Sequence, residues 1–426
     1  MKPATDLLAP AAAPTPPANL LQRLLRQALR SQLADLSCGE LTVVLPHGER
    51  LLVRGTAPGP HAQLVLHRWR PLLRLAAQGD LGLALSYRDG DWSTPDLVAL
   101  LQFGAANDQQ AGQQLQGKSW WRGLARLAHL RRANTRRGSR NNIAFHYDLG
   151  NAFYAQWLDA SMLYSSALYR RPEATLEEAQ AERLDRIVAL VDAPQGGEVL
   201  EIGCGWGALA LALAQRRGAQ VTGLTLSTEQ LAFARQRALA EGCAQQLDLR
   251  LQDYRDVQGQ YARIVSIEMV EAVGEAWWPT YFATLRERLA PGGHAVLQAI
   301  TIADAHFEGY RRGADFIQRC IFPGGMLPSP TALREQAARA GLVLQEELLF
   351  GDSYAATLVE WRRRFLAAWP AIAAQGFDLR FKRLWEYYLC YCEAGFRSGR
   401  VDVGLYTLRH ADASPGQRTP PPPLMG

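Results

Sequence analysis

The stretch V-L-E-I-G-C-G-W-G, residues 199–207, decides the fold of this chain. An apolar run over residues 208–214 follows it, so the pattern predicts a strand that turns through glycines into a helix. Glycines allow bare backbone N–H groups to meet a ligand at the N-terminus of such a helix. The spacing of Gly203, Gly205 and Gly207 is tighter than the G-x-G-x-x-G dinucleotide fingerprint. A tight strand–helix turn without a ligand is the alternative interpretation.

Strand and helix patterns alternate on both sides of this turn. The predicted strands are 198–202, 220–224, 247–251, 262–267 and 294–300. The predicted helices are 176–191, 208–216, 228–241 and 277–289, the last of which we expect Pro291-Gly292-Gly293 to stop. Alternation of this kind predicts an α/β fold with a doubly wound sheet, in which ligands bind beyond the carboxyl ends of the strands.

Composition divides the chain into five parts. Prolines interrupt residues 1–18, which we interpret as a disordered leader and not a signal peptide. Residues 19–106 show the helix and strand patterns of a small α+β domain. Residues 107–140 form a basic linker segment, residues 141–410 the catalytic domain, and residues 411–426 a proline-rich tail.

The basic linker segment has no acidic residue between Asp108 and Asp148. Trp120 and Trp121 stand at its head, and its cations are Lys118, Arg122, Arg126, Arg131, Arg132, Arg136, Arg137 and Arg140. A basic amphipathic helix with tryptophans suits an anionic membrane surface. A solvated linker is the main alternative. We expect no nucleic-acid partner, because no nucleic-acid motif accompanies the cations.

The overall composition excludes several classes of protein. The chain has 426 residues, of which 48% are hydrophobic and 20% are charged, with a net charge of +5. Its six cysteines have no framework spacing, so we expect reduced thiols, a cytoplasmic location and no metal site. No stretch approaches the ~18–20 apolar residues of a membrane-spanning helix.

Polar residues follow the other predicted strands. Thr225 comes after the second strand, and Gln230 lies in the first turn of the next helix. Both are candidates to form hydrogen bonds with the ribose hydroxyls of a nucleoside-containing cofactor. Asp253 follows the third strand, where it can accept a hydrogen bond from the amine of the cofactor's adenine. Tyr254 can stack on the adenine ring. E-x-G-x-G-x-G is typical of S-adenosylmethionine (SAM) methyltransferases. The fourth strand ends with two glutamates that suggest chemistry near this cofactor, Glu268 and Glu271.

The chain resembles the cyclopropane-fatty-acyl-phospholipid synthase family, which includes mycolic acid and cyclopropane fatty acid synthase-like methyltransferases. The resemblance spans roughly residues 35–410. It rests on H-Y-D-L-G-N-A-F-Y (146–154), M-L-Y-S-S-A-L-Y (162–169), V-L-E-I-G-C-G-W-G-A-L-A, G-L-T-L-S-T-E-Q, F-I-Q-R-C-I-F-P-G-G-M-L-P-S (316–329) and F-K-R-L-W-E-Y-Y-L-C-Y-C-E-A-G-F-R-S-G (381–399). The resemblance implies a Rossmann-like SAM methyltransferase fold with an N-terminal domain similar to a lipid carrier. It also implies a homodimer that lies at the inner face of the membrane.

The activity that the resemblance implies is methyl transfer from SAM to the double bond of an unsaturated phospholipid acyl chain. With the residues already named, the resemblance gives a full set of candidates for binding SAM. They are Tyr164, Ser165, Gly203, Gly205, Gly207, Thr225, Leu226, Gln230, Asp253 and Tyr254. Methyl transfer leaves a carbocation, which aromatic faces stabilise. The candidate aromatic residues are Tyr147, Tyr154, Tyr164, Tyr169, Phe316, Trp361, Trp385, Tyr387 and Tyr388, although most of them could equally form core or groove wall.

The family holds a bicarbonate ion as the base that removes the final proton. Its motifs align with Ser166, Glu271, Gln298, Ile300 and Tyr354 of this chain. Ser166 stands where the family has Cys, and Gln298 where it has His. Serine and glutamine still donate hydrogen bonds to an oxyanion, so bicarbonate binding stays open, but a possible proton acceptor is missing.

The fate of the carbocation determines the product. Loss of a proton from the new methyl group closes a cyclopropane ring, which is the first expectation. The alternative is a methyl- or methylene-branched acyl chain, which the changes at Ser166 and Gln298 suggest. A lipid-binding protein without catalysis and a methyltransferase for soluble small molecules are further alternatives.

Overall fold

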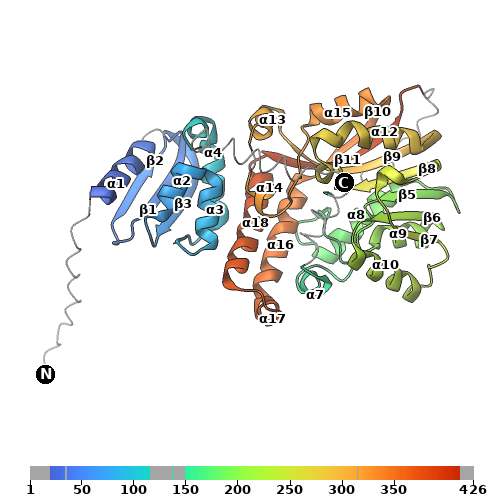
Figure 1. Ribbon diagram of the computed structural model, residues 1–426, viewed down its shortest axis with the longest axis horizontal. Helices are drawn as coiled ribbons and strands as arrows, with labels where there is room; N and C mark the ends of the chain where they lie inside the picture. Colours follow the sequence, from blue (N-terminus) through green and yellow to red (C-terminus); the bar gives the residue numbers. More distant parts are fainter. Residues whose placement is uncertain (1–19, 34–35, 116–137, 139–148, 314, 413–426) are drawn as a thin grey trace.

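Two β-sheets organise the chain, one in its N-terminal part and one in its C-terminal part (Figure 1). The computed structural model describes residues 20–33, 36–115, 138, 149–313 and 315–412. The predicted leader and residues 413–426 of the predicted tail lie outside these residues. So do residues 116–137 and 139–140 of the basic linker segment, which hold all of its cations and tryptophans. Tyr147 also lies outside the described residues.

The N-terminal sheet has the strand order β2-β1-β3-β4. Its strands are β1 (Cys38–Val44), β2 (Arg50–Arg54), β3 (Ala57–Leu66) and β4 (Trp92–Ser93). The helices beside it are α1 (Leu20–Leu33), α2 (Arg70–Gln78), α3 (Asp80–Arg88) and α4 (Leu97–Leu115). Alternate residues of β1 are buried, and Val43, Leu66 and Trp92 are at most 1% exposed. This burial gives the small α+β unit an apolar core, which is continuous with that of the C-terminal part.

The C-terminal sheet has seven strands in the order β10-β11-β9-β8-β5-β6-β7. They are β5 (Glu198–Ile202), β6 (Gln220–Thr225), β7 (Leu247–Leu251), β8 (Tyr261–Ile267), β9 (Leu289–Ile302), β10 (Leu342–Leu349) and β11 (Val401–His410). The strands from β9 to β7 are parallel, whereas β11 is antiparallel to both β9 and β10. The predicted doubly wound α/β fold with a smaller N-terminal domain is confirmed.

Helices pack on this sheet and beyond its carboxyl edge. The longer ones are α8 (Leu176–Val191), α9 (Ala208–Arg217), α10 (Thr228–Ala240), α12 (Trp278–Arg288), α13 (Asp304–Arg311), α15 (Pro330–Arg339), α16 (Gly351–Ala367) and α18 (Leu379–Arg397). The short ones are α7 (Asn151–Tyr154), α11 (Val270–Val273), α14 (Phe316–Cys320) and α17 (Trp369–Ala374). Thr175 and Glu178 form a capping box that starts α8 at the predicted residue.

One predicted boundary is wrong. Pro291-Gly292-Gly293 was expected to separate a helix from a strand that starts at residue 294, but β9 already begins at Leu289. Leu289 pairs with Tyr261, and the register shifts before the next pair. An irregularity of this kind accommodates proline and a left-handed glycine within a strand, because the extra residues leave the ladder locally.

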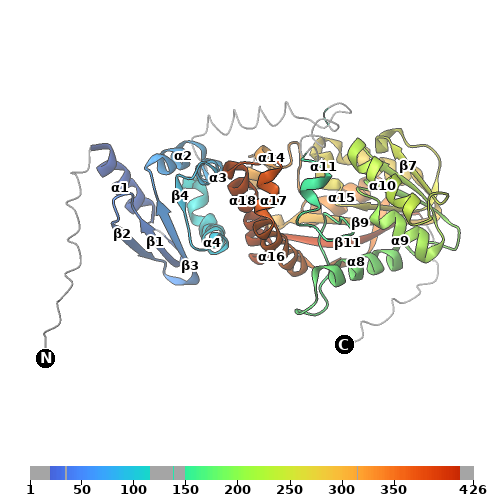
Figure 2. The ribbon, with the colours of Figure 1, turned by 90° about the horizontal axis from the view of Figure 1, so that it is seen from below.

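Helix α18 connects the two parts of the molecule. One side of it packs against α16, and another against α3 and α4 of the N-terminal unit (Figures 1 and 2). Arg380 forms a 2.7 Å ion pair with Asp89, and the Tyr87 hydroxyl donates to Glu386 at 3.2 Å. No helix among the described residues is long and apolar enough to cross a membrane.

Candidate active site

The glycine turn joins β5 to α9 at the carboxyl edge of the large sheet. Gly203, Gly205 and Gly207 have φ values of 86°, 52° and 82°, in the left-handed region that favours glycine. A Cβ atom would lie 2.6 Å from Sδ of Met269 at Gly203, and 2.9 Å from Cβ of Ala234 at Gly207. At Gly205 it would meet no atom within 4 Å, and Gly205 lines the main cavity. Gly205 therefore opens the turn toward a ligand.

The end of β6 supplies polar side chains to the same cavity. The Thr225 hydroxyl donates to Oε1 of Gln230 at 3.0 Å and accepts from the backbone N–H of Ser227 at 3.1 Å. Thr225, Leu226, Gln230 and Tyr254 all line the cavity, as do Gly203 and Gly205. The structure therefore brings most of the predicted cofactor residues together.

Gly207 and Asp253 are the exceptions, since neither lines the cavity, and the carboxylate of Asp253 is already engaged. Oδ1 accepts from the backbone N–H of Arg255 at 3.0 Å and from its Nε at 2.8 Å, and Oδ2 accepts from the guanidinium at 2.6 Å. The guanidinium also lies over the rings of Tyr254 and Trp277. An adenine amine would have to share Asp253 with this buried ion pair.

Glu201 is a site residue that the sequence interpretation overlooked. It is the acidic residue of the E-I-G-C-G-W-G motif, lies on β5, lines the cavity and is 3% exposed. Its Oε2 has no hydrogen-bond partner among the described residues, and burial raises its pKa to about 8. A buried carboxyl oxygen beside an open glycine turn fits a ligand that carries ammonium or hydroxyl donors, as SAM does.

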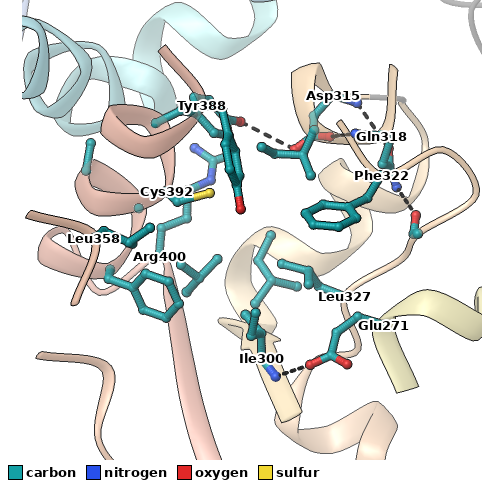
Figure 3. A pocket seen from close by; sticks show the side chains of 18 of the residues that line it. Glu271, Ile300, Asp315, Gln318, Phe322, Leu327, Leu358, Tyr388, Cys392 and Arg400 are labelled. Carbon is teal, nitrogen blue, oxygen red and sulfur yellow. Dashed lines mark hydrogen bonds between the residues drawn. The ribbon is translucent and has the colours of Figure 1, made fainter. Parts of the chain in front are cut away.

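The cavity continues from the glycine turn into an apolar space, and its volume is about 1600 Å³. Figure 3 shows this space between α14, α18 and β9, with Phe322 and Tyr388 facing it from opposite sides. Their ring centroids are 6.2 Å apart. The lining also includes residues of the N-terminal unit, among them Leu72, Leu81, Trp92, Leu101 and Phe103. A long acyl chain is the kind of ligand that such a cavity suits.

The predicted aromatic residues divide between wall and core. Tyr164, Tyr387 and Tyr388 line the cavity, and the hydroxyls of Tyr164 and Tyr388 are 2.8 Å apart. Tyr154, Phe316, Trp361 and Trp385 are at most 2% exposed and pack in the core, while Tyr169 is partly buried against it. More of the predicted aromatic residues therefore pack in or against the core than line the cavity.

Glu268 receives more donors than any predicted catalytic residue. It follows β8, and Oε1 accepts from the Ser165 hydroxyl at 2.6 Å, Nε2 of Gln298 at 2.7 Å and the Ser166 N–H at 3.3 Å. Oε2 accepts from the Tyr354 hydroxyl at 2.9 Å. Glu268 also lines the cavity. The donors come from three distant segments, which explains why sequence reasoning kept Glu268 only as a neighbour of Glu271.

Arg183 lies behind these donors and was not predicted. Its guanidinium, on α8, is 1% exposed and donates to the Ser165 hydroxyl at 3.0 Å and to Oε1 of Gln298 at 3.2 Å. Since Oε1 of Gln298 accepts from Arg183, the amide nitrogen of Gln298 is directed at Glu268. Burial lowers the pKa of Arg183, and Glu268 opposes this change.

Glu271 and Ile300 form a separate contact at the cavity wall. The N–H of Ile300 on β9 donates to Oε1 of Glu271, as the dashed line in Figure 3 marks, and both residues line the cavity. Oε2 of Glu271 has no hydrogen-bond partner among the described residues. Burial, and then the charge of Glu268, raises the pKa of Glu271 to about 8. At neutral pH Glu271 is therefore mostly protonated.

The five residues expected to hold bicarbonate do not fit that ion. Gln298, Tyr354 and the Ser166 N–H direct their hydrogen bonds at Glu268, and the Ser166 hydroxyl donates to the Ala167 carbonyl at 2.8 Å. Ile300 is bonded to Glu271. The donors predicted for an external anion are thus occupied by acceptors of the chain itself, two carboxylates and one backbone carbonyl.

Replacing Tyr354 with phenylalanine should lower kcat about tenfold, because Oε2 of Glu268 loses its hydrogen bond from a buried donor. KM should change little, since the ring that lines the cavity is retained. Steady-state kinetics at fixed pH would measure both values.

Tyr261→Phe is the matched control. Tyr261 is also buried, and its hydroxyl makes a 3.4 Å bond to the Gln258 carbonyl at the opposite end of β8. A kcat for Tyr354→Phe equal to that of Tyr261→Phe would contradict a role for the Tyr354 hydroxyl.

Comparisons with known proteins agree on one family. Its model, described as mycolic acid cyclopropane synthetase, matches residues 134–405. Tuberculostearic acid methyltransferase UfaA1 of Mycobacterium tuberculosis is 40% identical over 369 residues, 83% of this chain and 86% of that protein. Cyclopropane-fatty-acyl-phospholipid synthase of Escherichia coli is 36% identical over 334 residues, 78% of this chain and 83% of that protein.

A solved structure supports the same assignment. Mycolic acid cyclopropane synthase CmaA1, complexed with SAH and CTAB, is 29% identical to this chain and has a TM-score of 0.60. The match covers 63% of this chain and 97% of that one.

Proposed function

The chain belongs to the mycolic acid cyclopropane synthetase family, and from this premise we propose that it methylates the double bond of unsaturated phospholipid acyl chains. It is a SAM-dependent methyltransferase. The proposal that the substrate is an acyl chain rests on one observation. A single cavity runs from the open glycine turn at Gly205 to apolar side chains of both units, including Phe322 and Leu72.

Both ends of the cavity suit their proposed ligands. Bound SAM supplies an electrophilic methyl group. Gly205, Glu201 and the Thr225–Gln230 pair form the polar end that would hold SAM. Tyr388 and Phe322 wall the apolar end, where their rings would exclude water and face a cationic chain carbon.

Two products remain candidates for this reaction. A cyclopropane ring is the first, in line with the family resemblance. A methyl- or methylene-branched chain is the second, and Gln298 favours it because an amide at that position cannot accept the proton that the family's histidine could. A ring and a methylene branch both form by loss of a proton from the transferred methyl group, whereas a methyl-branched alkene forms by loss of a proton from a chain carbon.

The proposal extends to where the enzyme works. Phospholipid acyl chains are reached at a bilayer surface, so we expect cytoplasmic protein at the inner face of an anionic membrane. The net charge of +5 favours such contact. A homodimer is the expected assembly.

Fatty-acid mass spectrometry of cells that express the protein tests this function. With methyl-deuterated methionine, a ring product and a methylene branch both keep two of the three methyl deuterons, whereas a methyl branch formed by proton loss from a chain carbon keeps all three. Cells that carry Gly205→Ala provide the background. Lipids with no added carbon from an expressed, SAM-binding protein would overturn the proposal and favour the inactive lipid-binding alternative.

A further inference from the structure

Glu268 holds the place in this site where an external base was expected. Its carboxylate accepts hydrogen bonds from Ser165, Ser166, Gln298 and Tyr354, three of which align with the family's bicarbonate pocket. We propose that Glu268 is the catalytic base of this enzyme, built into the chain in place of bicarbonate. This inference rests on the proposed function, because it names the group that accepts the proton after methyl transfer.

The donors match a carboxylate and hold it in one orientation. An ionised carboxylate has only acceptor oxygens, and each oxygen of Glu268 receives at least one donor at 2.6–2.9 Å. The Ser165 hydroxyl accepts from both Arg183 and Gln298, at 3.0 and 2.9 Å, so its own proton is left for Glu268. Arg183 is therefore a positioning residue for the whole set.

The backbone brings Glu268 to this point by an unusual conformation. Its φ is +51°, one of three positive values among the described residues other than glycine. Its N–H donates to the Gln298 carbonyl at 2.8 Å, which ties the end of β8 to β9. Left-handed backbone in a residue with a side chain costs energy and persists where the surroundings hold it. Here the four donors hold the carboxylate against the cavity.

Glu271 is less suited to be the base. One of its oxygens is bonded to the Ile300 N–H, and burial keeps it mostly protonated at neutral pH. Asp315 is another acidic residue that lines the cavity. It caps α14, where it accepts from the Gln318 N–H at 2.9 Å.

The proposed step balances in atoms and charge. The sulfur–methyl bond breaks with its electron pair going to sulfur, and the alkene π electrons form the new carbon–carbon bond. The neighbouring chain carbon is left as a cation. A Glu268 oxygen takes a proton, and the electrons of the broken C–H bond form either the third ring bond or a new double bond. Glu268 then releases the proton to solvent. No oxidant or reductant is needed.

The full chain, assayed on vesicles of unsaturated anionic phospholipid, tests this role. Wild type should turn over equally in buffer depleted of carbon dioxide and in buffer with added bicarbonate. Glu268→Gln should lose about 100-fold in kcat, a typical contribution of a general base. Its affinity for SAH, measured by calorimetry, should stay within about threefold of wild type.

Glu268→Gly provides the sharper variant. Glycine adopts the left-handed backbone without strain and leaves the donors of Gln298 and Tyr354 to an added anion. Bicarbonate should restore its turnover about tenfold or more and raise its melting temperature, but should not shift the melting temperature of wild type. Glu275→Gln, in which an exposed carboxylate paired with Arg311 is neutralised, is the matched control and should retain wild-type turnover.

Two results would overturn the inference while leaving the proposed function intact. One is a wild-type enzyme whose turnover requires bicarbonate. The other is a folded Glu268→Gln protein with wild-type kcat. The wild-type measurement decides even where both variants fail to fold. Wild-type protein that alkylates no lipid under either condition would instead overturn the proposed function.

Discussion

Gly205→Ala is expected to weaken SAM binding about 100-fold, or roughly 2.7 kcal/mol. Gly205 has a φ of 52°, and its Cβ position is empty and opens into the cavity. An added methyl group would occupy the space that the cofactor needs and hold it away from the backbone N–H groups of the turn. Calorimetric titration with SAM and with SAH would measure the loss.

Gly259→Ala is the matched control. It carries the conformational cost of alanine in left-handed backbone without any contact with the cofactor. Gly259 also has a positive φ, 87°, and its Cβ position is also empty, but it lies in the turn before β8. Both variants bear the penalty of roughly 1–2 kcal/mol for alanine in left-handed backbone. Equal SAM affinities for the two alanine variants would mean that the cofactor does not approach Gly205.

Arg183→Met should lower the free energy of unfolding by about 3 kcal/mol, within the range for one partner removed from a buried charged network. It should also reduce kcat about tenfold or more, since Gln298 and Ser165 lose the bonds that direct their donors at Glu268. Methionine keeps most of the volume, so the effect reports the lost hydrogen bonds and charge. Denaturant unfolding and steady-state kinetics measure the two effects.

The control for this change is on the same helix. Arg186→Met removes an ion pair with Glu346, at 2.9 Å, which is partly exposed to solvent. Such pairs contribute about 1 kcal/mol or less. A kcat for Arg183→Met no lower than that of Arg186→Met would show that Arg183 does not position the donors.

Local patterns predicted the fold well. The strand, glycine turn and helix at residues 198–217 lie within one residue of their predicted bounds, because their apolar runs and the glycines between them are neighbours in the sequence. The start of β9 was missed for the opposite reason. Pro291 and its two glycines resemble a helix stop, and only pairing with Tyr261, 28 residues earlier, makes Leu289 part of a strand.

The site was harder to predict, since its contacts join distant segments. The structure brings the side chains of Gln298 and Tyr354 together, and the group to which both donate is Glu268. That outcome depends on a backbone conformation that no spacing reveals. Asp253 shows that a contact between near neighbours in the sequence was also missed. Arg255 stands two residues away in the sequence, yet the ion pair that engages Asp253 becomes evident only when both side chains are placed.

Helix α18 has a consequence for the ancestry of the protein. One side of it carries Tyr388 and Cys392 into the cavity, while Arg380 and Glu386 bind the N-terminal unit. A descendant gene that lost or exchanged this unit would uncover apolar surface on the same helix that shapes the cavity. It would then need new side chains along α18 to stay soluble. The two units are therefore expected to evolve as a pair, with changes at their boundary accompanied by changes in the cavity wall.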